Sequence, residues 1–143
     1  MMNRVAVIFW SGTGNTEKMA QAIAEAGREA GAEVDLLPVS EVSAAQAAKY
    51  DRLALGCPAM GAEVLEEMEF EPFFTELESC LSGKRVALFG SFGWGDGQWM
   101  REWYARTEEA GAVMVGDQGL MAHEFPTSDV LERCGALGRE LAG

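Results

Sequence analysis

The sequence predicts a single doubly wound α/β domain that spans residues 1–143, with a five-stranded parallel sheet in the order 2-1-3-4-5 and helices on both faces. Two observations lead to this prediction. Short apolar runs alternate with amphipathic stretches along the chain, and glycine-containing loops follow three of those runs. The 143 residues fit one domain, and no linker or change of composition divides them.

The first strand is expected at Val5–Trp10, a continuous apolar run typical of a strand buried on both faces. A helix is expected from Thr16 to about Glu29, because its apolar residues recur at helical spacing. Ser40 and Ser43 are candidate helix starts. Further strands are predicted at 34–39, 53–57 and 85–90 and from 113, and further helices around 73–77, over 98–110 and over 129–141.

The formal net charge of −12 comes from 23 acidic and 11 basic residues. This charge argues against nucleic acid or an anionic membrane surface as the main partner. It favours a basic partner protein, or serves solubility alone. The apolar run at Val5–Trp10 is too short for a signal peptide or a membrane span, so we expect a cytoplasmic protein.

Cysteine and histidine are too few and too scattered for a disulfide framework or a metal site. Cys57, Cys80 and Cys134 are widely spaced and form no CxxC pair, and His123 is the only histidine. Cys57 is expected to be a small buried apolar residue rather than a redox thiol. We expect no metal.

A loop rich in hydroxyl groups follows the first strand. Ser11-Gly12-Thr13-Gly14-Asn15-Thr16 stands at the start of a helix, where free backbone N–H groups and the helix dipole favour an anion. The loop lacks a Walker A lysine, and Glu17 replaces the third glycine of a dinucleotide fingerprint. The alternative is a tight turn with an ordinary cap, which needs only one hydroxyl. We therefore expect a terminal monophosphate.

The loop after the third strand, Pro58-Ala59-Met60-Gly61-Ala62-Glu63, contains an apolar side chain where an exposed residue is expected. Met60 could lie beneath a flat ligand, and Gly61 permits a positive φ. An Ω-loop whose methionine packs onto the core explains the pattern equally well.

The loop after the fourth strand, Ser91-Phe92-Gly93-Trp94-Gly95-Asp96-Gly97, places a tryptophan between glycines. An exposed indole is a liability unless it stacks on a ligand or a partner. The alternative is a tryptophan that anchors the core, a role that Trp99 and Trp103 on the next helix fit better.

In a parallel sheet these three loops meet at the carboxyl ends of the strands. They provide a phosphate site and apolar and aromatic surfaces, a combination that suits a planar ring with a phosphate tail. The chain contains no GxSxG motif and no Cys–His arrangement, so we expect no catalytic residue.

With these motifs the chain resembles the short-chain flavodoxins, close to the clostridial kind, over essentially its whole length. The motifs that carry the resemblance are Trp-Ser-Gly-Thr-Gly-Asn-Thr-Glu at 10–17, Met-Gly-Ala-Glu at 60–63 and Gly-Ser-Phe-Gly-Trp-Gly-Asp-Gly at 90–97. The resemblance implies a flavodoxin-like fold and one non-covalently bound FMN. It also implies a low-potential carrier of single electrons between redox proteins, not an enzyme.

The resemblance implies that cofactor-binding residues come from all three loops: Ser11, Gly12, Thr13, Gly14, Asn15, Thr16, Ala59, Met60, Gly61, Ala62, Glu63, Ser91, Phe92, Gly93, Trp94 and Gly95. The first loop and Ser91 would contact the phosphate. Met60 and Trp94 would lie on opposite faces of the flavin ring.

The resemblance also implies polar contacts to the ring. Glu63 would accept from the N3–H, Gly93 would donate to the pyrimidine edge, and the Gly61 carbonyl would turn to meet N5–H on one-electron reduction. Two residues depart from the pattern. Pro58 replaces a serine that would reach the phosphate, and Ala62 stands where a polar or acidic residue is common.

A run of acidic residues follows the second loop: Glu63, Glu66, Glu67, Glu69 and Glu71. Like charges about 8 Å apart repel by roughly 2 kcal/mol at an effective dielectric near 20, so such a patch would make the reduced cofactor a strong reductant. It would also attract redox partners with basic docking surfaces to the protein. We expect the protein to be a monomer. The alternative is a solvated helix start, where acids complement the dipole.

Two other functions remain as alternatives. A small FMN-dependent reductase of flavodoxin-like fold would need a substrate pocket over the ring, for which the chain has little length to spare. A phosphate-binding regulatory domain would need acidic residues at the end of the first strand, where Ser11-Gly12-Thr13 stands.

Overall fold

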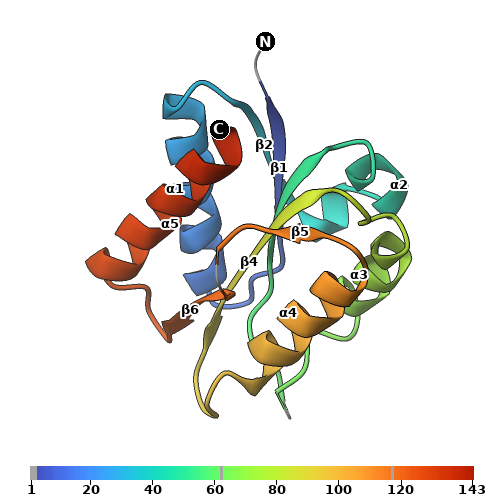
Figure 1. The fold of residues 1–143 in the computed structure, drawn as a ribbon. Coiled ribbons are helices and arrows are strands. Elements are labelled where there is room, and N and C mark those ends of the chain that lie inside the picture. Colours follow the sequence, from blue (N-terminus) through green and yellow to red (C-terminus); the bar gives the residue numbers. More distant parts are fainter. Residues whose placement is uncertain (1–2, 62, 117) are drawn as a thin grey trace.

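The computed structural model describes residues 3–61, 63–116 and 118–143 and has a parallel sheet between two layers of helices (Figure 1). Five strands are hydrogen-bonded in the order β2-β1-β3-β4-β5, which confirms the predicted doubly wound topology. They are β1 (Arg4–Phe9), β2 (Glu33–Pro38), β3 (Arg52–Gly56), β4 (Arg85–Phe92) and β5 (Val113–Met114).

The last part of the sheet differs from the prediction. A sixth strand, β6 (Leu120–His123), also pairs with β4 in parallel, so the edge position is shared by two short strands. β5 lies beside the start of β4 and β6 beside its end. Gly116, which has a φ of 91°, lies between the two short strands. An extended strand cannot contain this backbone conformation, so the expected single fifth strand is divided.

The helices are α1 (Asn15–Glu29), α2 (Ala44–Ala47), α3 (Phe70–Glu78), α4 (Gln98–Glu109) and α5 (Ser128–Ala142), with a 3₁₀ turn η1 (Val39–Glu41). α1 and α5 cover one face of the sheet, and α2, α3 and α4 cover the other (Figure 1). Ser43 begins α2 with a reciprocal capping box to Gln46, as its position predicted. Ser40 lies inside η1.

The sheet is buried on both faces, as the continuous apolar run in β1 predicted. Val5, Val7 and Phe9 pack on the α1 and α5 side, while Ala6 and Ile8 pack on the opposite side. This alternation follows from the two-residue period of a strand. The two buried layers hold the strand ends, and therefore the loops after them, at fixed positions.

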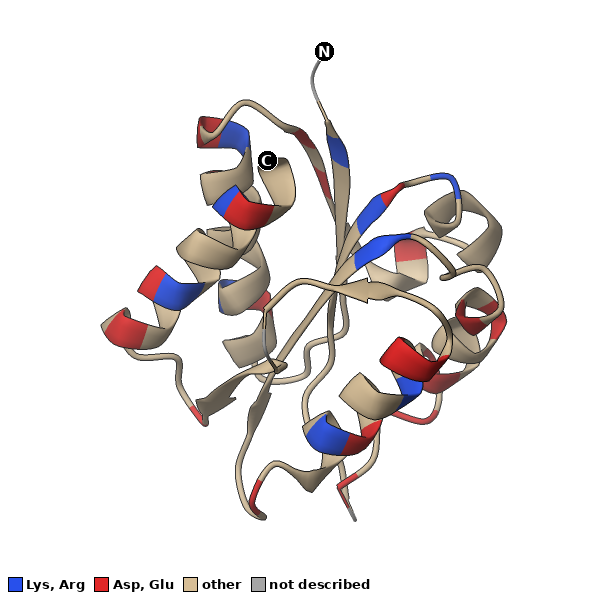
Figure 2. Ribbon diagram, viewed as in Figure 1, with Lys and Arg blue, Asp and Glu red and all other residues tan. Residues whose placement is uncertain are grey.

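Basic residues gather at the edge of the sheet where the strands begin. Arg4, Arg52 and Arg85 are the first residues of β1, β3 and β4 (Figure 2). The guanidinium groups of Arg52 and Arg85 donate to the carbonyls of Leu141 and Glu140 in the last turn of α5. A cation at this position complements the negative end of the helix dipole. In a doubly wound fold the helix N-termini then face the opposite edge, where the strands end.

The cysteine thiols are free in this structure. Cys57 is fully buried at the end of β3, and burial raises the pKa of its thiol far above the ordinary value. The prediction that Cys57 is a small buried apolar residue is therefore confirmed. Within the described ranges, no helix has the length and apolar character needed to cross a bilayer.

Candidate functional site

A pocket with a volume of about 280 Å³ lies at the carboxyl edge of the sheet. The three predicted loops meet there. From the predicted set, the pocket is lined by Ser11, Gly12, Thr13, Asn15, Thr16, Ala59, Met60, Ser91, Phe92 and Gly93. Among the described residues that line it there is no lysine or arginine.

The first loop is shaped by its own hydroxyl groups. Gly14 has a φ of 94° at the N-cap of α1, and the Ser11 Oγ accepts from the N–H groups of Gly14 and Glu17 at 3.1 and 3.3 Å. Thr13 Oγ1 accepts from Asn15 N at 3.4 Å. A hydroxyl that accepts from the backbone keeps its own proton for another acceptor. The loop therefore offers O–H donors at a helix N-terminus, which suits an anion.

A buried pair of hydroxyl groups joins the first loop to the third. Thr16 Oγ1 lies 3.2 Å from Ser91 Oγ and accepts from Ser91 N at 3.3 Å. Both residues are buried, and both line the pocket. The pair fixes the start of α1 against the end of β4.

The second loop is closed by backbone hydrogen bonds between Met60 and Val64, in both directions, at 2.9 and 3.1 Å. Ala59 N donates to Ser91 O at 3.0 Å, which ties this loop to β4. Met60 is half-buried and lines the pocket. Gly61 has a φ of 46° and is exposed.

Glycine at position 90 lets the second and third loops approach closely. A Cβ on Gly90 would lie 2.2 Å from the carbonyl oxygen of Cys57, a distance that no side chain can adopt. The same carbonyl accepts from the indole N–H of Trp99 at 3.1 Å. Trp99 and Trp103 are both buried, which confirms that they are core tryptophans.

Trp94 differs from these core tryptophans, because 65% of its surface is exposed. It stands beyond the third loop's packed part, where Phe92 contacts the rings of Trp99 and His123 at centroid distances of 5.6 and 5.0 Å. His123 Nε2 lies 3.2 Å from Gly93 O. The histidine is exposed and contacts the third loop.

Some predicted site residues do not line the pocket. Gly14, Gly61, Glu63, Trp94 and Gly95 lie outside its lining, although they belong to the loops that form it. Ala62 lies outside the described residues. The pocket therefore includes residues from all three predicted loops, but it does not include Trp94, the side chain predicted to lie on one face of the ring.

A comparison with known proteins gives the chain's family. The family model described as "Flavodoxin" matches residues 7–136. The flavodoxin of Clostridium beijerinckii is 46% identical over 136 residues, which cover 95% of this chain and 97% of that protein. The flavodoxin of Megasphaera elsdenii is 46% identical over 138 residues, which cover 96% and 98%. The chain belongs to the flavodoxin family.

Solved structures agree with this assignment. The solution structure of two-electron reduced Megasphaera elsdenii flavodoxin has a TM-score of 0.88 at 46% identity and covers 96% of this chain and 98% of its own. Oxidised flavodoxin 1 from Bacillus cereus has a TM-score of 0.86 at 29% identity and covers 97% of each chain. This flavodoxin is an FMN-binding electron carrier that acts with redox partner proteins, and it is not an enzyme.

The donor set of the pocket fits FMN. Its lining combines neutral hydroxyl donors and a helix N-terminus with the apolar side chains of Met60, Phe92 and Trp10. A flavin supplies the redox chemistry when bound, and the protein supplies its position and its electrostatic surroundings.

Three residues line the pocket of this flavodoxin that were not in the predicted set: Trp10, Pro58 and Glu124. Trp10 and Pro58 adjoin the predicted loops. Glu124 follows β6 and has a φ of 60°, and its N–H donates to Phe92 O at 2.7 Å. Because the sequence does not show that a strand ends at His123, it gives no sign that a fourth loop reaches the site.

The acidic run after the second loop is not the open patch that the sequence predicted. Glu66 is buried, and its carboxylate accepts from the N–H groups of Met68, Glu69 and Phe70 at 2.8–2.9 Å. Burial alone would raise the pKa of Glu66, but the three backbone hydrogen bonds outweigh it and lower the pKa. Glu66 thus caps the N-terminus of α3.

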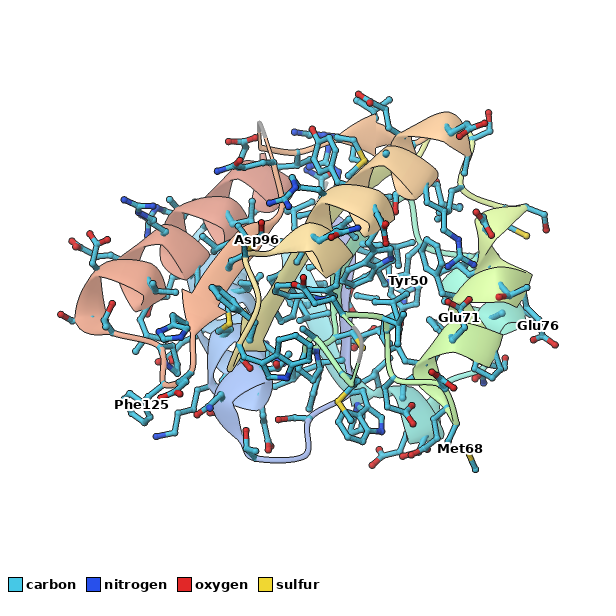
Figure 3. All side chains as sticks on the ribbon, turned by 90° about the horizontal axis from the view of Figure 1, so that it is seen from below. Tyr50, Met68, Glu71, Glu76, Asp96 and Phe125 are labelled. Carbon is cyan, nitrogen blue, oxygen red and sulfur yellow. The ribbon has the colours of Figure 1, made fainter. Side chains whose placement is uncertain are left out.

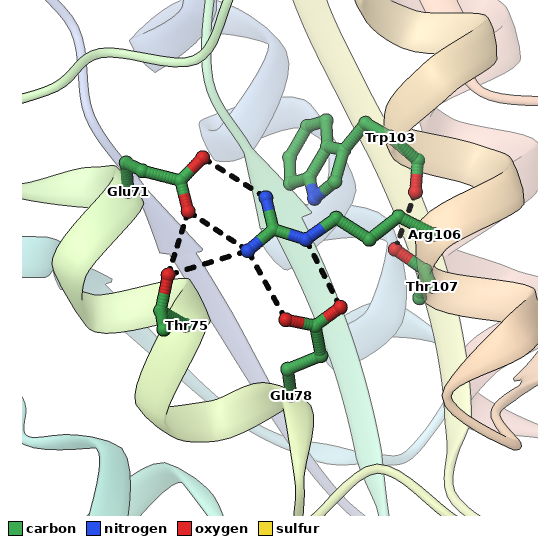
Figure 4. A network of polar contacts seen from close by, with 6 residues as sticks. All are labelled: Glu71, Thr75, Glu78, Trp103, Arg106 and Thr107. Carbon is green, nitrogen blue, oxygen red and sulfur yellow. Dashed lines mark hydrogen bonds and ion pairs between the residues drawn. The ribbon is translucent and has the colours of Figure 1, made fainter.

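Glu71 is paired, which the sequence prediction also missed. The Arg106 guanidinium donates to both Glu71 oxygens at 2.9 and 2.8 Å and to both Glu78 oxygens at 3.0 and 3.1 Å (Figure 4). These bonds from Arg106 lower the pKa of Glu71. Of the five acids, only Glu67 and Glu69 are exposed, and Glu69 accepts from the Trp10 indole N–H at 3.2 Å.

The Arg106 network joins α3 to α4, and its side chains are about one-third exposed. We expect Arg106→Met to lower the free energy of unfolding by about 1 kcal/mol, because solvent screens the lost attraction. Chemical denaturation at low and high salt measures the effect. Salt should shrink the difference between the variant and the wild type, and a difference that grows with salt would contradict the electrostatic explanation.

Proposed function

We propose that the three loops at the carboxyl edge bind FMN with its phosphate at residues 11–16 and its ring between Met60 and Trp94. The observation that carries this proposal is the hydroxyl-lined pocket at the start of α1, which contains no basic side chain among its described residues. A dianionic phosphate in such a pocket is held by O–H donors and by backbone N–H groups.

The Thr16–Ser91 pair allows a direct test. We expect Thr16→Val to weaken FMN binding about tenfold, because one hydroxyl of the phosphate site is lost. Binding of riboflavin, which lacks the phosphate, should change by less than about twofold. Both dissociation constants can be measured by quenching of flavin fluorescence in apoprotein titrations.

Thr107→Val is the matched control, since Thr107 is equally buried but donates to Trp103 O inside α4. It should leave the affinities for both flavins unchanged. An equal loss of FMN and riboflavin affinity in Thr16→Val would show that the residue acts on packing rather than on the phosphate.

We also propose that this carrier docks basic redox partners at the carboxyl edge. Glu17, Glu67 and Glu124 are exposed there, and no ion pair involves them within the described part of the chain. Apolar side chains accompany them. Met68 is 85% exposed, and Figure 3, which looks onto this edge, shows Met68 and Phe125 projecting outward at its periphery. A surface that presents exposed apolar side chains together with charged ones is typical of a docking surface.

The salt dependence of electron transfer tests the charge of the partner. The rate of transfer to a basic haem protein should fall at least about fivefold between roughly 20 mM and 500 mM salt. The rate to an uncharged quinone should not change. An equal effect of salt on the two electron-transfer rates would contradict the proposed electrostatic steering.

We further propose that the protein is a low-potential carrier, acts as a monomer and resides in the cytoplasm. Exposed carboxylates near the cofactor oppose additional negative charge on it. Free cysteines, one of them exposed, are compatible with a reducing compartment. Sedimentation of the FMN-loaded protein tests the oligomeric state.

A further inference from the structure

The side chain of Glu63 reaches from the second loop to the start of α4. Its Oε1 accepts from Gly97 N at 3.2 Å and from Gln98 N at 3.1 Å. Glu63 itself has a φ of 56°, a left-handed conformation that a glutamate rarely adopts. Such a conformation persists only where surrounding contacts hold it.

The two loops are shaped to fit this contact. Gly95, with a φ of 88°, lies so close that a Cβ there would be 2.6–2.9 Å from the carboxylate atoms of Glu63. The backbone bridge between Met60 and Val64 closes the base of the loop that carries Glu63. The carboxylate also complements the positive end of the α4 dipole. We call this set of hydrogen bonds the Glu63–α4 contact.

Only one carboxylate oxygen is used. Both backbone donors bond to Oε1, and Oε2 accepts no hydrogen bond from the residues that the structure describes. A carboxylate can accept through both oxygens at once. The arrangement therefore fixes the orientation of Glu63 while leaving one acceptor free.

We propose that Glu63 is a positioning residue that joins the Met60 loop to the Trp94 loop before the cofactor binds. The Glu63–α4 contact sets the separation of these two loops in the apoprotein and holds Oε2 ready as an acceptor. The part of this inference that concerns the flavin rests on the proposed placement of the ring, whereas the contact itself does not.

Amide hydrogen exchange of the apoprotein tests the contact without any flavin. In Glu63→Ala, protection of the Gly97 and Gln98 amides should fall at least about tenfold. In Glu63→Gln the side-chain carbonyl still accepts, so protection should stay within about threefold of the wild type. Glu67→Ala, which removes an exposed glutamate of the same run, should leave both amides unchanged. Wild-type protection in Glu63→Ala would overturn the proposal.

Flavin titrations test whether Oε2 of Glu63 accepts from the flavin N3–H, the contact that the resemblance implies for this residue. The wild type should bind FMN at least about tenfold more tightly than FMN methylated at N3, a difference that both Glu63 variants should lose. Glu63→Gln should nevertheless bind FMN as fast as the wild type, while Glu63→Ala should bind it more slowly, because its loops are no longer held together. Equal association rates in the two variants would also overturn the proposal.

The two measurements separate this inference from the proposed function. A wild type that shows no preference against N3 methylation would refute the placement of the ring, and the exchange result for Gly97 and Gln98 would still decide the Glu63–α4 contact.

Discussion

Replacement of Glu66 by alanine is expected to lower the free energy of unfolding by about 3 kcal/mol, the largest effect of any change considered for this flavodoxin. The carboxylate satisfies three backbone N–H groups at the start of α3, and the alanine variant leaves those donors without an acceptor. For a chain of this length the melting temperature should fall by about 10 °C.

Glu67→Ala is the natural control, because Glu67 is adjacent and exposed. It should change the free energy of unfolding by less than about 0.5 kcal/mol. Equal effects of the two substitutions would show that the acidic run acts only through its total charge, not through the cap.

The same cap gives stability a pH dependence of defined sign. The pKa of Glu66 is lower in the folded protein than its ordinary value, so the folded state favours the ionised form. This contribution is fully present above the ordinary glutamate pKa of about 4.3, and it is lost as the pH falls through the lower, folded value. Glu66→Gln should therefore lose less stability on acidification than the wild type does. An unchanged acid slope in denaturant melts would contradict this assignment.

The second large effect is expected at Trp94. Because Trp94 is 65% exposed and makes little contact with the core, Trp94→Ala should leave the melting temperature of the apoprotein unchanged. It should weaken FMN binding by about 10- to 100-fold, since stacking of an aromatic side chain on a flat heterocycle contributes about 1–3 kcal/mol. Riboflavin should lose affinity by the same factor, because the ring and not the phosphate is affected.

Val113→Ala provides the comparison for Trp94. Val113 is also an exposed apolar residue, but it lies in β5 beside the start of β4, at the opposite edge of the sheet. Its removal should not change flavin affinity. An effect of Trp94→Ala below about twofold would show that the indole does not contact the ring.

The locations of the acidic residues follow from the fold itself. Helices that return along parallel strands present their N-termini at the edge where the strands end, and carboxylates are stabilising there. Glu66 accepts from the first backbone N–H of α3, and Glu63 accepts from the first backbone N–H of α4. The basic residues at the other edge complement the end of α5. Negative charge at the carboxyl edge of the sheet is therefore partly a consequence of helix capping.

Local patterns predicted most of the fold. The apolar run of β1 and the hydroxyl-rich start of α1 are both signals within a few adjacent residues, and the buried strand and the helix start that they predict are confirmed. The division of the last strand could not be predicted, because it depends on the backbone at Gly116 and on pairing with β4.

The errors at the site have a similar cause. Glu124 reaches the pocket through a long-range hydrogen bond to Phe92 and through a positive φ. Because the residue with the positive φ is not a glycine, the sequence does not indicate this conformation. The partners of Glu71 come from a helix far along the chain. For Glu66, however, a local signal exists, since this acid lies one turn before Phe70, the apolar residue that begins α3.

The placement of the phosphate and the ring can be tested most directly by amide chemical shifts of the apoprotein titrated with FMN and with riboflavin. We expect FMN to shift the amides of residues 11–16 strongly and riboflavin to leave them nearly unchanged. Both flavins should shift the amides of Met60, Gly61 and residues 91–95. Equal shifts of residues 11–16 with both flavins, or changes confined to another part of the chain, would contradict the proposed site.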